Sequence, residues 1–425
     1  MFRKSRAFES RPAWLRDAVT DRVRDRELAP TLGLVFGLAL AFHAGTGILG
    51  AVRAGIPFSE LAAYFDGHLY LQVAKSFPLP YSGEGRSYLT HAPLYPALVW
   101  LVHLVVPSAL AGWGTLAIWV AWLGSAAGAA AFYLLAREVG ARPGWATAFY
   151  VLANPRWASI AATAHAEAVA MPLVILCLLA FSRRRLGWCV VWLSLASLAR
   201  FPAILLGGPL AFGVLVLRRD FRIRNFAWLS LPLLVLALFQ LYQYLRIPDF
   251  GGLLQEHSGL WDAHLVWPFQ AFLEFGARFH RTFGIQQLLL DLSLAFYFSA
   301  ILVGLRRGSG ESGFVLAGCV AILAFFHVSL SGRPAVSAFP RLVVLAWPAA
   351  LLLHWRWLSP RLPSLAAAIL AAWLGAASLW IGTHQVAGAV VLQKQRLPYF
   401  PRVLETLEQD RPDWLELGGA AQRRR

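Results

Sequence analysis

Five side chains that could act together on a polar substrate stand at the edges of apolar segments: Asp66, His91, His165, Glu167 and Arg200. A carboxylate can accept a proton from a hydroxyl group, while a guanidinium or an imidazole can bind a phosphate. These residue types therefore indicate acid–base chemistry next to an anion-binding group.

Each of these residues also has a purely structural interpretation. Asp66 is consistent with a solvated acid on a loop, and His91 with an interfacial histidine beside the belt residue Tyr95. Glu167 is either a functional group or a structural pairing partner, because an ionisable group beside an apolar run needs a charge or water. The partner of Arg200 is either a lipid-linked phosphate or Glu167. Further along the chain, Arg341 binds either an anion or lipid headgroups.

The composition that surrounds these residues is that of a membrane protein. Of 425 residues, 58% are hydrophobic and only 14% charged, and the mean hydropathy is +0.57, which excludes a soluble enzyme. Lys and Arg number 38 against 22 Asp and Glu, but the arginines stand in short clusters between apolar runs. They indicate topology rather than nucleic-acid binding. Cys177, Cys189 and Cys319 form no CxxC pair, so neither a disulfide framework nor a zinc site is indicated.

Apolar runs of roughly 17 to 25 residues, the length that crosses a bilayer, recur along the chain. They cover residues 31–52, 115–136, 143–162, 166–182, 226–246, 286–305, 313–330, 341–358 and 364–386. The longer run 186–217 is interrupted by Arg200 and Pro202, and a hairpin that turns at Arg200 puts the basic clusters on one, cytoplasmic side. Keeping the basic clusters on the cytoplasmic side also requires that the segment 91–107 does not cross the membrane. We therefore expect an all-α polytopic transmembrane bundle of about 11 crossings, with juxtamembrane helices on the extracytoplasmic side.

This topology divides the chain into three regions. Residues 1–29 form a basic amphipathic segment on the cytoplasmic surface, residues 30–392 form the bundle, and residues 393–425 form a C-terminal tail on the outer side. The candidate site residues fall on the outer face, whose expected loops are 53–90, 247–285 and 331–340.

The first outer loop is expected to contain a helix that carries Asp66. Ser59 can cap this helix, and Asp66 then lies within it near the membrane surface. The carboxylate would then face a polar cavity, while apolar residues at a spacing of four would rest on lipid or on neighbouring helices. These apolar residues are Leu61, Phe65, Leu69 and Val73.

Several short motifs follow one another in a fixed order on the predicted outer face. They are Tyr64-Phe65-Asp66-Gly67-His68-Leu69-Tyr70, Pro93-Leu94-Tyr95-Pro96, Asn154-Pro155, Ala164-His165-Ala166-Glu167, Leu198-Ala199-Arg200 and Phe339-Pro340-Arg341. In this order, the chain resembles the GT-C superfamily of glycosyltransferases, and most closely the GPI mannosyltransferase 2 family and its bacterial relatives. The match spans residues 60–350 as separate motifs rather than as continuous identity.

The resemblance implies a helical membrane bundle with an extracytoplasmic active site and a polyprenyl-phosphate sugar, usually mannose, as donor. It also implies that Asp66 takes the place of the catalytic aspartate. The chain departs from the family in two places: Phe65 stands where the family often has Trp, and His165-Ala166-Glu167 where it has Tyr-Ser-Glu. These departures bear on the sugar that the donor carries.

Under this interpretation, Asp66 removes a proton from an acceptor hydroxyl, which attacks the anomeric carbon with inversion and expels polyprenyl phosphate. Tyr95 and Glu167 belong to the substrate site. Cationic groups would bind the leaving phosphate: Arg200 is the first candidate, followed by His165, His91 and Arg341. These cations could replace a metal, and no cofactor is required. A divalent metal held by His257, Asp262 and His264 is left open but is not indicated by their spacing.

The expected partners are a polyprenyl-phosphate-linked sugar, a lipid, glycan or protein acceptor, and membrane lipids, but no nucleic acid. The expected location is the cytoplasmic membrane of a bacterium, since arginine greatly outnumbers lysine. The main alternative is a lipid or solute transporter, or flippase, in which Arg200 and Glu167 form a gate or coupling pair. A third interpretation is a non-catalytic scaffold of the cell envelope, which would bury Asp66 in a salt bridge.

Overall fold

The computed structural model describes residues 13–64, 66–77, 91–246, 252, 264–270, 273, 292–305, 310–330, 343–349, 351 and 364–396. Helices make up nearly all of this part, and its only β-type pairing is an isolated bridge between Leu265 and Leu330. Long apolar sequences fold as helices in lipid because a helix satisfies its own backbone polar groups.

Four helices in the described part are long and apolar enough to cross a membrane. They are Glu27–Ala54 of α1 (Ala13–Ala54), α4 (Trp113–Glu138), α10 (Ile223–Arg246) and Glu311–Val328 of α13 (Gly310–Val328). Shorter apolar helices accompany them, namely α3 (Leu94–Val105), α7 (Glu167–Ser182), α8 (Leu186–Ala199), Phe201–Leu217 and Leu292–Leu305. The chain is therefore an integral membrane protein, as its composition predicts.

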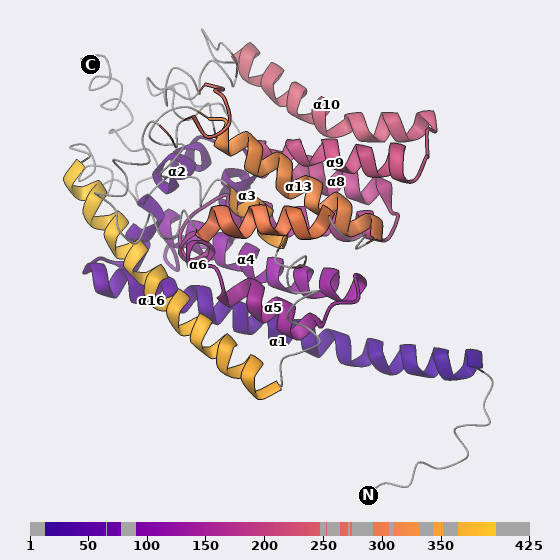
Figure 1. Cartoon of the computed structure of the whole chain (residues 1–425). Coiled ribbons are helices and arrows are strands. Elements are labelled where there is room, and N and C mark those ends of the chain that lie inside the picture. The colour runs from indigo at the N-terminus through magenta and orange to yellow at the C-terminus, as the bar shows by residue number, and fades with distance from the viewer. Residues whose placement is uncertain are drawn as a thin grey trace, which may run out of the picture.

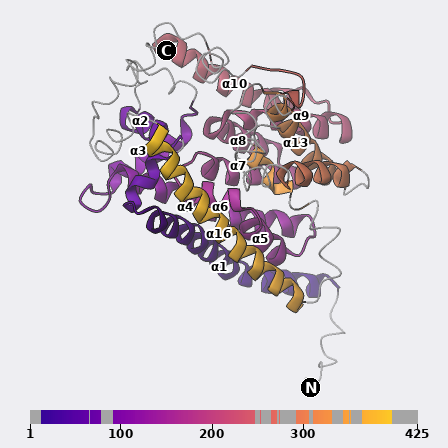
Figure 2. The same ribbon diagram turned by 60° about the vertical axis from the view of Figure 1, so that its left-hand side comes forward.

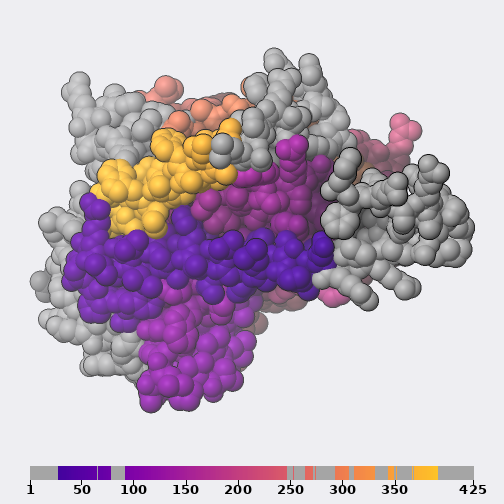
Figure 3. Space-filling model, turned by 90° about the horizontal axis from the view of Figure 1, so that it is seen from below, coloured from indigo at the N-terminus to yellow at the C-terminus, as the bar shows by residue number. Residues whose placement is uncertain are grey.

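The helices pack as a bundle (Figure 1). In it, α4 lies against α1 and α7, and α7 lies against α8. Helices in lipid associate closely where small residues let their backbones approach. At Gly124 of α4, an added Cβ would lie 2.7 Å from the carbonyl oxygen of Ala168 in α7. The last described helix, α16 (Ser364–Arg396), crosses the outside of α1 (Figure 2), and the two helices form much of one face of the molecule (Figure 3).

The segment 186–217 is a hairpin, as predicted. After α8 come η4 (Phe201–Leu206), α9 (Gly207–Phe212) and η5 (Gly213–Leu217), and the two ends of the segment, at Leu186 and Val214, line the same cavity. Two further contacts gather the basic clusters at this end. Arg183 pairs with Glu138 at 2.8 Å, and Arg218 pairs with Glu311.

The crossing expected over 143–162 is divided into two helices, α5 (Pro143–Leu152) and α6 (Pro155–Ala161). Pro155 has no backbone N–H to continue α5, and it suits the first position of a new helix. The side chain of Asn154 caps that helix, since its Oδ1 accepts hydrogen bonds from the backbone N–H groups of Arg156 and Trp157 at 3.0 and 3.1 Å. The expectation of one continuous helix here is therefore wrong.

The structure also bears on the expectations for α1, α3 and residues 341–358. The helix α1 runs without a break through the boundary expected at residues 29 and 30, with Pro30 inside it. The 12-residue helix α3 is about 18 Å long, which is too short to cross a bilayer. Within 341–358, the described part is the 3₁₀ helix η6 (Val343–Ala349) and Leu351. The segment 331–340, most of 247–285 and the tail beyond Arg396 lie outside the described residues.

Candidate active site

Asp66 lies at a break between two helices rather than inside one. The chain forms η2 (Phe58–Ala63), becomes extended at Tyr64, and starts α2 (Gly67–Ser76) with Asp66 as its N-cap residue. The expected helix through Asp66, capped by Ser59, is therefore wrong: the residue before η2 is Pro57, and no side chain caps η2. Leu61 and Leu69 of the expected lipid-facing stripe are buried, so these elements pack inside the protein.

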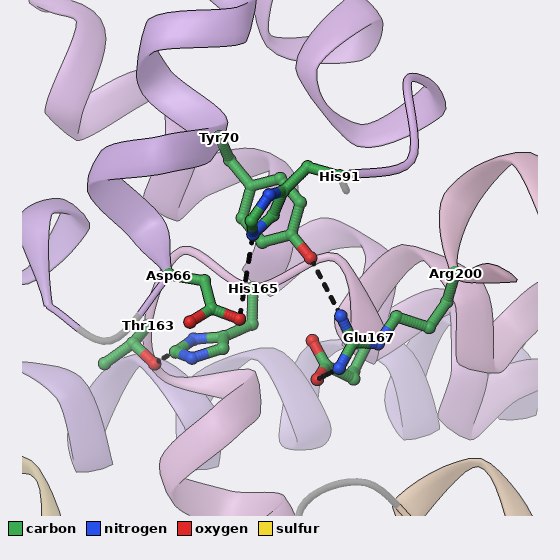
Figure 4. Close-up of polar contacts among 7 residues, drawn as sticks. All are labelled: Asp66, Tyr70, His91, Thr163, His165, Glu167 and Arg200. Atoms are coloured by element: carbon green, nitrogen blue, oxygen red, sulfur yellow. Dashed lines mark hydrogen bonds and ion pairs between the residues drawn. The ribbon is translucent and has the colours of Figure 1, made fainter. Parts of the chain in front are cut away.

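The Asp66 carboxylate is not used to cap α2, although Asp is a common capping residue. Its side chain is 20% exposed, and Oδ2 lies 3.9 Å from Nε2 of His91 (Figure 4). That distance is too long for a hydrogen bond, and it is an ion pair only when His91 is protonated. The carboxylate therefore lies at a partly exposed position beside His91.

A buried turn between α6 and α7 supports Asp66 from the other side. An added Cβ at Gly67 would overlap the carbonyl oxygen of Ala62 and would lie 3.3 Å from that of Ala164. This close approach brings Asp66 beside His165, whose Nδ1 lies 2.8 Å from the hydroxyl of Thr163 (Figure 4). His165 is fully buried, so its ring is held in one orientation.

Glu167 and Arg200 form an ion pair at the same end of the bundle. Nη2 of Arg200 lies 3.2 Å from Oε1 of Glu167, and the two side chains are 17% and 1% exposed. The helix α8 ends at Ala199, and Arg200 takes extended backbone angles between α8 and η4. Pro202 stands in the first turn of η4, where its missing backbone N–H costs no hydrogen bond. Of the two partners considered for Arg200, the structure contains Glu167.

Tyr70 lies between the pair of Asp66 and His91 and the pair of Glu167 and Arg200. Its hydroxyl accepts a hydrogen bond from Nη1 of Arg200 at 3.2 Å, and its ring meets the edges of His91 and Tyr95, at 4.8 and 5.3 Å between centroids. The Tyr95 hydroxyl donates to the carbonyl of Ala117 at 2.8 Å. Burial, followed by the nearby Tyr70 and Glu167, raises the pKa of Tyr95 well above its usual value. Tyr95 therefore remains a neutral donor that supports Tyr70 from behind.

The structure brings together the predicted residues Asp66, His91, His165, Glu167 and Arg200 (Figure 4). Tyr95 packs against the ring of Tyr70. Arg341 lies outside the described residues.

Three further residues of this neighbourhood are absent from the sequence-based set: Tyr70, Thr163 and His327. His327, near the end of α13, is buried and lies in the neighbourhood of Arg200. Its signal in the sequence is a lone histidine at the end of an apolar run.

No group of three or more His, Cys, Asp or Glu side chains that could hold a metal occurs among the residues the structure describes. His257 and Asp262 lie outside that part of the chain. Within it, Arg200 carries a positive charge beside Glu167.

The fold is similar to that of a solved membrane protein. It superimposes on the crystal structure of ArnT from Cupriavidus metallidurans bound to undecaprenyl phosphate with a TM-score of 0.50 and 17% sequence identity. The match covers 90% of this chain and 76% of that chain. No family model and no curated protein match the sequence. This similarity confirms the predicted fold class, an all-α polytopic membrane bundle.

Proposed function

We propose that this chain is a membrane glycosyltransferase that moves a sugar from a polyprenyl-phosphate donor to an acceptor hydroxyl. The observation that carries the proposal is the Asp66 carboxylate, which is 20% exposed and is not used to cap its helix. The shared fold supports the donor class, since ArnT was solved bound to undecaprenyl phosphate. The proposed location is a bacterial cytoplasmic membrane with the site on the extracytoplasmic face.

In the proposed reaction, Asp66 accepts the proton of the acceptor hydroxyl as that oxygen attacks the anomeric carbon of the donor. The bond from this carbon to the phosphate oxygen breaks, and polyprenyl phosphate leaves with the electron pair. A single displacement of this kind inverts the anomeric configuration, so no covalent intermediate with the protein is needed. The sugar is proposed to be mannose, following the resemblance of the sequence motifs.

Arg200 is proposed to bind the leaving phosphate. Glu167 neutralises part of its charge and orients the guanidinium, and Tyr70 accepts a hydrogen bond from it. His91 and His165 stand on the Asp66 side and can add further hydrogen bonds. Charge that develops on the phosphate in the transition state would be stabilised by these groups.

We propose that the transfer needs no metal, because Arg200 supplies the positive charge that a metal would otherwise bring. Treating the purified protein with EDTA should leave the transfer rate unchanged within about twofold. Loss of the activity on chelation and its return with added Mg²⁺ or Mn²⁺ would contradict this part of the proposal.

The position of the ion pair favours a transferase over a transporter. Glu167 is the first residue of α7 and Arg200 directly follows the last residue of α8, so both lie at helix ends. Coupling residues of transporters usually lie near the bilayer midplane. A scaffold role that buries Asp66 is also disfavoured, because the Asp66 side chain is 20% exposed.

The direct test is to incubate the purified protein with a panel of polyprenyl-phosphate sugars and a mixture of candidate lipid and glycan acceptors. We expect one donor to be consumed, with release of polyprenyl phosphate and a glycosylated product of inverted configuration. Transport of an intact polyprenyl-phosphate sugar across liposomes without any transfer would instead support the flippase alternative.

A further inference from the structure

A second polar site lies at the end of the bundle opposite Asp66. A cavity of about 790 Å³ opens where α8 begins and α10 begins, and five arginines line it: Arg184, Arg218, Arg219, Arg222 and Arg224. The same helix α8 that starts at this cavity ends next to Arg200. The cavity is therefore separated from the candidate active site by the length of a helix.

Three of these arginines carry charge that the described part of the chain does not neutralise. Arg218 pairs with Glu311, and Arg222 lies 3.5 Å from Asp220. Arg184, Arg219 and Arg224 form no ion pair with any described residue. Like charges that face one cavity repel each other, so an anion that enters it would be strongly favoured.

Two of the unpaired arginines also have unusual backbone conformations. Arg184 and Arg219 have φ angles of 57° and 52°, in the left-handed region that favours glycine. Each is the second residue after the end of a helix, α7 and η5 respectively. The residue that follows each donates a backbone hydrogen bond to the last turn: Arg185 to Ala180, and Asp220 to Val214. Glycine is the usual residue at such an end. An arginine at both places is unfavourable for the backbone and puts two guanidinium groups at the cavity.

The surroundings of the cavity suit a lipid rather than a soluble anion. Trp228 lines the cavity and is 38% exposed. From there, large apolar side chains on the outside of α8 and α10 remain exposed, including Trp188 at 56% and Leu233 at 61%. Tryptophan is enriched where membrane meets water, and acyl chains can cover exposed apolar helix faces. Basic pockets between membrane helices bind anionic lipid headgroups.

We propose that this cavity binds the phosphate headgroup of an anionic phospholipid, with Arg184, Arg219 and Arg224 as its ligands. A lipid with two phosphates, such as cardiolipin, matches the three unpaired charges best. The acyl chains would lie along α8 and α10. This inference does not depend on the proposed transferase activity, because no residue of the Asp66 site takes part.

The test uses the purified full chain in neutral detergent and measures binding of tetraoleoyl cardiolipin by native mass spectrometry. In the test variant, Arg184→Asn is combined with Arg219→Asn, because asparagine tolerates the left-handed conformation and removes the charge. The matched control combines Arg142→Asn with Arg185→Asn, which removes two exposed arginines from the same end without touching the cavity lining.

We expect the test variant to bind cardiolipin at least about tenfold more weakly than the wild type, with an unchanged melting temperature, while the control stays within about twofold. Dioleoyl phosphatidylcholine should not compete, and inorganic phosphate at millimolar concentration should not displace the lipid. Equal binding by the test variant and the control would overturn the proposal. Displacement by inorganic phosphate alone would overturn the assignment to a lipid.

Discussion

Arg200 and Glu167 show how strongly a single contact can constrain this site. Glu167 is almost completely buried, and Arg200 is its ion-pair partner at 3.2 Å. Removing one member of a buried pair leaves the other charge without compensation, which costs far more than the pair itself contributes. Arg200 therefore has a structural role in addition to its proposed role in phosphate binding.

The variant Arg200→Ala should lower the free energy of unfolding by about 3–5 kcal/mol. The double variant that adds Glu167→Leu should recover part of this loss, because no uncompensated charge remains. Thermal unfolding in detergent checks both. Arg183→Ala is the matched control: its pair with Glu138 is 40% and 31% exposed, so at most about 1 kcal/mol should be lost. A double variant less stable than Arg200→Ala would contradict the argument.

The sequence predicts that Arg200 needs a partner, because its neighbours are apolar, but it leaves two partners open. The choice depends on how α7 and α8 pack, which no spacing along the chain specifies. The position of His327 could not be predicted either. It lies 127 residues after Arg200 in sequence and comes near it only because of how the helices pack. Residue types could thus be predicted from the sequence, whereas their pairing could not.

At the scale of elements, the junction of η2 and α2 sets the position of Asp66. The chain can make this junction because Gly67 lacks a side chain and lies against the carbonyl oxygens of Ala62 and Ala164. Asp66 precedes this residue directly. A larger residue at position 67 must therefore push the two segments apart and move the carboxylate.

The variant Gly67→Ala should reduce sugar transfer by about tenfold or more, because a displacement of about 1 Å at a reacting group can cost that much. Transfer rate and melting temperature should be measured together. The matched control is Gly45→Ala in α1, where an added Cβ meets nothing within 4 Å and stability should be kept or slightly raised. Full activity in Gly67→Ala would show that Asp66 need not be held as closely as proposed.

The length and polarity of apolar runs predict the spans in α1, α4, α10 and α13 because membrane helices follow the thickness of the bilayer. The charge clusters correctly predict the hairpin at Arg200. Hydropathy alone does not reveal the division of 143–162, since the break depends on Pro155 and the cap from Asn154. The helix expected through Asp66 fails for a similar reason, because tertiary contacts at Gly67 override an apolar period of four.

The whole molecule has two chemically different ends, one with Asp66, Glu167 and Arg200, and one with the arginine-lined cavity. Positive charge marks the cytoplasmic side of membrane proteins. We therefore expect the Asp66 end to face outward, where a polyprenyl-phosphate sugar would meet its acceptor.

Cysteine labelling in intact cells should show this orientation. The three native cysteines are buried, so the wild type should not react with a membrane-impermeant maleimide. Ser108→Cys lies in the exposed turn between α3 and α4, at the Asp66 end, and should be labelled from outside. Arg185→Cys lies at the basic end and should be labelled only after the membrane is permeabilised. The opposite pattern would place the candidate site on the cytoplasmic face.

The measurement that tests the central claim most directly is sugar transfer by the variant Asp66→Asn, which keeps the shape of the side chain and removes its ability to accept a proton. General-base catalysis contributes about 10² to 10⁴ in rate, so we predict at least a hundredfold slower transfer with unchanged melting temperature. The control Glu138→Gln, at the opposite end of the bundle, should keep the wild-type rate. Transfer by Asp66→Asn at close to the wild-type rate would contradict the assignment of Asp66 as the base.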